Sequence, residues 1–182
     1  MNLLLAFAPF ITFAVIDRLF DSLAGLIAAA IVSAILLLRD KVAGHREWPL
    51  LEIGTLLLFG GLAAYAAAFA PDWSVIGVRL RVDAGLLAVV LLSIAAGRPF
   101  TLVYARRSVP AALWDQPEFL RTNVVISTAW ALAFAALVAA DVLMLLRPDL
   151  PLRLGILVTV AALVGAVKFT DWYAWQQRAM AK

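Results

Sequence analysis

Six apolar runs, separated by short polar connections, constrain this chain more than any other feature. They lie at residues 3–20, 22–38, 49–70, 82–97, 123–146 and 152–172. A helix needs about 20 apolar residues to cross the bilayer core. The first, second and fourth runs are therefore short unless arginines beside them extend to the interface. We expect an all-α fold, a polytopic transmembrane helical bundle of five or six helices, built as a single domain over residues 1–182.

Composition excludes a water-soluble domain. Of the 182 residues, 65% are hydrophobic and 15% are charged, whereas soluble domains contain about 25% charged residues. The chain has no cysteine and one histidine, which excludes disulfides, thiolate chemistry and multi-histidine metal sites. That histidine, His45, lies in a basic loop and is expected to be solvated. No cofactor and no metal are expected.

The distribution of basic residues predicts the orientation in the membrane. The connection between the second and third runs, the connection between the fourth and fifth runs, and the C-terminus together hold nine lysines and arginines, against five on the opposite side. Lysine and arginine are enriched in cytoplasmic loops, so both termini are expected to face the cytoplasm. The first run lacks a basic start and a small-residue cleavage site, which predicts a retained span.

The longest polar stretch, residues 97–122, combines bases with aromatic rings. Arg98, Arg106, Arg107 and Trp114 are predicted to contact lipid headgroups, because guanidinium groups bind anionic lipids and indole rings favour the interface. The other rings in this stretch are expected at the same depth: Phe100, Tyr104 and Phe119. The alternative is a basic loop that only sets the orientation. The net charge of +3 then indicates contact with anionic lipid and not with nucleic acid.

Charged residues at the end of the first run form the first candidate site. Asp17 and Asp21 are four residues apart and would share a face of one helix, with Arg18 beside them. One interpretation is a cation site, or a carboxylate pair that binds a phosphate through a metal. The alternative is an interfacial helix cap, in which Asp21 begins the second helix and Arg18 reaches the headgroups.

A polar and aromatic stripe on the fifth run forms the second candidate site. At about 100° per residue the following residues fall on one face: Asn123, Ser127, Trp130, Phe134, Leu137 and Asp141. Because a charge in hydrocarbon is costly, this face should pack inward. It either holds helices together or lines a polar pocket that contacts a ligand. Arg147, Arg153 or Arg18 could reach the Asp141 carboxylate.

Two further sets of residues call for an explanation within the apolar runs. Lys168 and Asp171 are three apart in the last run and are predicted to pair with each other or with Glu52, as an inner-face charge cluster. Glycines, which permit close helix approach, occur at Gly25, Gly60, Gly61, Gly85 and Gly165.

Several short motifs, in order along the chain, resemble one known family. Phe7-x-Pro9-x-x-x-Phe13 is followed by Arg18-Leu19-Phe20-Asp21, then by Phe59-Gly60-Gly61-Leu62, by Arg98-Pro99-Phe100, and by Trp130-Ala131 with a polar residue eleven positions after the tryptophan. This pattern resembles the bacterial intracellular septation protein A family. The last polar position is Asp141 here, where the family has an asparagine, so no role is carried over to it.

The resemblance implies a multi-pass protein of the bacterial inner membrane that acts in cell-envelope maintenance or cell division. Its expected partners are membrane lipids and envelope-synthesis or division proteins. A homo-oligomer is expected if the chain is a transporter, because six short helices enclose little volume alone. The family has no assigned catalytic residues, so none is expected here. Two alternatives stay open: a small transporter, channel or lipid-handling protein that uses Asp141 and the Asp17/Arg18/Asp21 cluster, or an enzyme acting on lipid phosphates.

Overall fold

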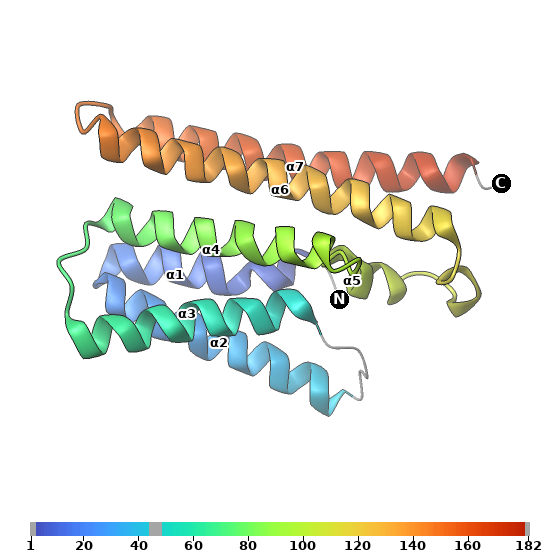
Figure 1. Ribbon diagram of the computed structural model, residues 1–182, viewed down its shortest axis with the longest axis horizontal. Helices are drawn as coiled ribbons and strands as arrows, with labels where there is room; N and C mark the ends of the chain where they lie inside the picture. Colours follow the sequence, from blue (N-terminus) through green and yellow to red (C-terminus); the bar gives the residue numbers. More distant parts are fainter. Residues whose placement is uncertain (1–2, 44–48, 181–182) are drawn as a thin grey trace. The chain divides into compact units, whose positions relative to one another are not determined.

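The computed structural model describes residues 3–43 and 49–180, so the prediction for His45 lies outside the described residues. Within these ranges the chain is helical and contains no strand, as predicted. The elements, shown in Figure 1, are η1 (Leu3–Phe7), α1 (Ala8–Leu19), α2 (Ser22–Val42), α3 (Leu50–Phe69), α4 (Val75–Ala95), α5 (Thr101–Arg106), η2 (Ala111–Leu113), α6 (Pro117–Leu146) and α7 (Leu152–Met180).

Four of these helices are long and apolar enough to cross a membrane: Ser22–Val42, Leu50–Phe69, Pro117–Leu146 and Leu152–Gln177. They indicate a multi-pass membrane protein. The predicted first span is represented by the 12-residue α1 and the short η1. The predicted fourth span corresponds to α4, which begins at Val75 and not at residue 82, so that Arg79, Arg81 and Asp83 lie within the helix.

The predicted run begins too late because a hydropathy profile treats Arg79 and Arg81 as part of a loop. The structure instead accommodates each charge on the helix. Arg79 and Asp83 form an i,i+4 ion pair at 3.8 Å, and the Arg81 Nη1 donates to the Gly77 carbonyl at 2.7 Å. The Arg81 guanidinium also lies 4.4 Å from the ring centroid of Trp73. Paired and stacked charges of this kind are compatible with a helix end at an interface.

The described chain divides into two compact units, Met1–Val89 and Val90–Lys182. In the first unit α2 packs against both α1 and α3, as Figure 1 shows. Its core is an apolar cluster drawn from four helices: Phe13, Leu26, Ala29, Phe59, Ala63, Val78 and Val82. The rings of Phe13 and Phe59 are 5.7 Å apart, so aromatic packing joins α1 to α3.

Close helix approach occurs at some of the glycines and not at others. A Cβ on Gly25 would lie 3.0 Å from the backbone nitrogen of Asp17, and one on Gly85 would lie 2.2 Å from Leu58 Cδ1. These two positions bring helices together as expected. The expectation is wrong for Gly60, Gly61 and Gly165, where an added Cβ would meet nothing within 4 Å. Glycine spacing alone does not tell a packed helix face from an open one.

In the second unit α6 and α7 form an antiparallel hairpin, visible in Figure 1. The preceding segment begins where Gly97, at a φ of +68°, ends α4. The Gly97 and Arg98 amides donate to the carbonyls of Ile94 and Ser93, the hydrogen-bond pattern that commonly ends a helix at a glycine. The Phe100 amide then donates to the Ser93 hydroxyl at 3.1 Å, which directs the chain into α5 and toward α6.

Candidate functional site

The polar stripe of α6 lies inside the protein. All six of its members are buried: Asn123, Ser127, Trp130, Phe134, Leu137 and Asp141. Four of them are among the largest fully buried side chains of the described residues, namely Trp130, Phe134, Asn123 and Asp141. The inward packing that the stripe predicts is therefore present along about 27 Å of helix, since each residue adds about 1.5 Å.

Hydroxyl groups join α5 to the first turns of α6. The Thr101 hydroxyl donates to the Asn123 carbonyl at 3.1 Å and lies 2.9 Å from the Ser127 hydroxyl. A threonine has one hydroxyl proton, so Ser127 donates to Thr101. The Asn123 Nδ2 donates to the Phe119 carbonyl at 2.8 Å. Its Oδ1 is buried and receives no hydrogen bond from the described residues.

Trp130 joins α6 to α7. Its indole nitrogen donates to the Thr170 hydroxyl at 3.0 Å, and that hydroxyl donates to the Ala166 carbonyl at 2.8 Å. Within α6, the Trp130 ring also contacts the ring of Phe134 in a tilted arrangement, with the ring centroids 5.7 Å apart. Sequence reasoning missed Thr170 and Thr101, the partners of this stripe. Each is a single hydroxyl with no periodic signal of its own.

Asp141 is fully buried, with 0% of its surface exposed. The arginine expected to reach it from the end of the same helix does not do so. Arg147 instead binds Asp149 through two parallel hydrogen bonds of 3.0 Å, from Nε to Oδ1 and from Nη2 to Oδ2. Asp149 is two residues from Arg147, in the loop after α6. It is therefore closer to Arg147 along the chain than Asp141 is.

This exposed pair changes the ionisation of both groups. The hydrogen bonds from Arg147 lower the pKa of Asp149 below its ordinary value of 3.8, assisted by a backbone hydrogen bond. The same contact raises the pKa of Arg147. A charge-assisted, two-point contact favours the charged form of each partner. The pair links Arg147 to Asp149 within the turn between α6 and α7.

The cluster of Asp17, Arg18 and Asp21 is a helix connection. α1 ends at Leu19, Phe20 has φ −128° and ψ −93°, and Asp21 is extended with its carboxylate accepting from the Ala24 amide at 2.8 Å. The prediction that Asp17 and Asp21 share a helix face is wrong, because the helix breaks between them. The interpretation of Asp21 as the cap of the second helix is confirmed.

Asp17 and Arg18 complete this connection. The Asp17 carboxylate accepts a hydrogen bond from the Ser22 hydroxyl in the first turn of α2, while Arg18 is exposed. In the part of the chain that the structure describes, neither Asp17 nor Asp21 forms an ion pair with an arginine. Each carboxylate serves the α1–α2 turn.

The predicted inner-face charges occupy different environments. Glu52 is buried in the first turn of α3, where the helix dipole favours a negative charge. Lys168 and Asp171 are both exposed on α7 and, among the described residues, do not pair with each other. Glu52 belongs to the first compact unit and the α7 residues belong to the second.

The basic segment between α4 and α6 is partly ordered by its own rings. The Arg106 guanidinium lies 5.2 Å from the ring of Trp114, and that of Arg107 lies 5.9 Å from the ring of Tyr104. The Trp114 indole donates to the Val109 carbonyl at 3.1 Å, and Arg98 is exposed. The rings of Phe100 and Tyr104 are buried, 1% and 6% exposed, so they are unavailable to headgroups, contrary to the prediction.

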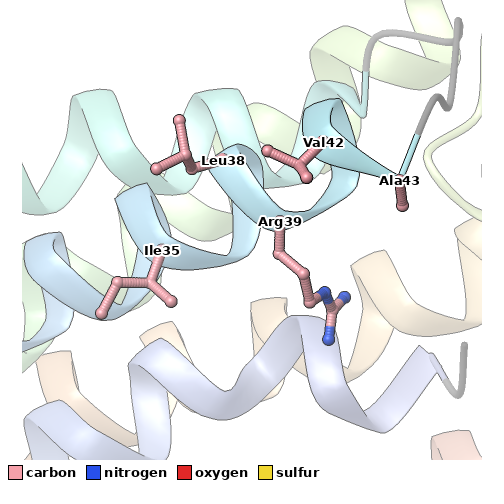
Figure 2. A pocket seen from close by; sticks show the side chains of 5 residues that line it. All are labelled: Ile35, Leu38, Arg39, Val42 and Ala43. Carbon is pink, nitrogen blue, oxygen red and sulfur yellow. The ribbon is translucent and has the colours of Figure 1, made fainter.

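A shallow groove of about 450 Å³ lies at the end of α2. Figure 2 shows its lining: Ile35, Leu38, Arg39, Val42 and Ala43. The Arg39 guanidinium points away from Leu38 and Val42, and its Nη2 donates to the Asp40 carboxylate at 3.0 Å. Apart from Arg39, the residues that line the groove are apolar, so it offers mainly apolar contacts.

Comparison with protein-family models, with curated proteins and with solved structures finds no match. The resemblance to the septation protein A family accordingly rests on the short motifs alone.

Proposed function

We propose that this chain is a multi-pass membrane protein with a structural role, acting in envelope maintenance or cell division through contacts with lipids and membrane proteins. The observation that carries the proposal is that polar residues of the α6 stripe form hydrogen bonds that hold helices together. Trp130, Ser127 and Asn123 form hydrogen bonds to α7, to α5 and within α6. Polar side chains used in this way act as helix–helix contacts.

The arrangement at the α1–α2 turn supports the same proposal. Asp21 caps α2 and the Asp17 carboxylate accepts from Ser22. These are the hydrogen bonds of a helix turn, whereas an enzyme acting on lipid phosphates would need the acidic pair and arginines to converge within about 4–6 Å. The resemblance to septation protein A supplies the proposed setting, the bacterial inner membrane.

Deletion of the gene tests the proposal. We expect longer cells or greater sensitivity to envelope stress, and we expect both defects to be reversed by the wild-type chain. A chain with Asp141→Asn should also reverse them, provided that membrane extracts contain it at the wild-type level. Asparagine is nearly the same size as aspartate, so the variant tests the charge of Asp141 without a large change in packing.

A second function is favoured by one observation, the complete burial of Asp141. Intramembrane acids often mark ion or substrate pathways. If the chain is a transporter or channel, Asp141→Asn will preserve folding in detergent and fail to reverse the deletion phenotype. That result would contradict the structural role.

A further inference from the structure

We draw no further inference here: the strongest candidate, the open apolar groove of the α6–α7 hairpin that small residues such as Ala129, Ala133 and Gly165 line, carries none, because nothing in the structure shows what covers it.

Discussion

Two glycines in neighbouring helices are expected to respond oppositely to the same substitution. At Gly25 a Cβ would meet the Asp17 backbone at 3.0 Å and the Phe13 ring at 3.1 Å, whereas at Gly60 it would meet nothing within 4 Å. Gly25→Ala should lower the free energy of unfolding by about 1–3 kcal/mol through overpacking. Gly60→Ala should raise it by about 0.5–1 kcal/mol, because alanine favours helix.

Unfolding in mixed micelles, followed by helical circular dichroism, measures both changes. Equal stabilisation by the two alanines would contradict the close approach of α1 and α2 at Gly25. The pair also separates helix propensity from packing, since the propensity gain is common to both positions.

The ion pair in the α6–α7 turn predicts a pH dependence. The pKa of Asp149 is lowered in the folded protein by Arg147, so the pair stabilises the turn at pH values above the ordinary pKa of 3.8. This contribution is lost as the pH falls through the lowered pKa, where the carboxylate becomes protonated.

A titration of the Asp149 carboxyl by NMR measures this directly. The midpoint should lie below 3.8 in the wild type and should move upward in Arg147→Gln. Because both side chains are more than half exposed, high salt should move it in the same direction by screening the pair. An unchanged midpoint in Arg147→Gln would show that the two-point contact does not persist in solution.

At the scale of elements, the hydrogen bond between Trp130 and Thr170 couples α6 to α7. A double-mutant cycle with Trp130→Phe and Thr170→Val should give a coupling energy of about 0.6 kcal/mol, the average for interhelical hydrogen bonds in a membrane protein. Trp172→Phe is the control, because Trp172 is 54% exposed, and its cycle with Thr170→Val should give no coupling. A zero value for the first cycle would remove Trp130 from the helix–helix contact.

Periodicity predicted these elements better than it predicted their ends and partners. The α6 stripe follows from a 100° repeat and is buried as expected. The α1–α2 break does not follow from it, because the break is set by the backbone at Phe20 and by the cap at Asp21. Local sequence also supplied no signal for the pairing of Ser127 with Thr101, a contact between residues 26 positions apart.

The partner of Arg147 illustrates the same limit at a charged residue. The helical rise predicted that Arg147 could reach Asp141. In the structure Arg147 instead binds Asp149, in the turn after α6, at 3.0 Å. This contact depends on the backbone conformation of the turn, which brings the Asp149 carboxylate to Arg147 after α6 ends. A hydropathy profile contains no such information.

At the scale of the whole molecule, the number of membrane crossings depends on α4. Its 21 residues would span about 31 Å, but three charges near its start exclude it from the four candidate spans. Arg79 pairs with Asp83, and Arg81 lies over Trp73. We therefore expect α4 to cross the membrane with these groups at one interface. The predicted orientation, with both termini facing the cytoplasm, also requires α4 to cross the membrane. That orientation stays a prediction.

The absence of cysteine makes single-cysteine labelling a clean test of this crossing. Asp72→Cys precedes α4, Asp115→Cys precedes α6 and Pro148→Cys follows α6, and all three positions are exposed. If α4 crosses, a membrane-impermeant maleimide added to intact cells will label residues 72 and 148 and spare residue 115. If α4 stays on one side, residues 72 and 115 will share their accessibility. Opposite labelling of 115 and 148 is expected in both cases, because α6 alone separates them, and it serves as the internal control.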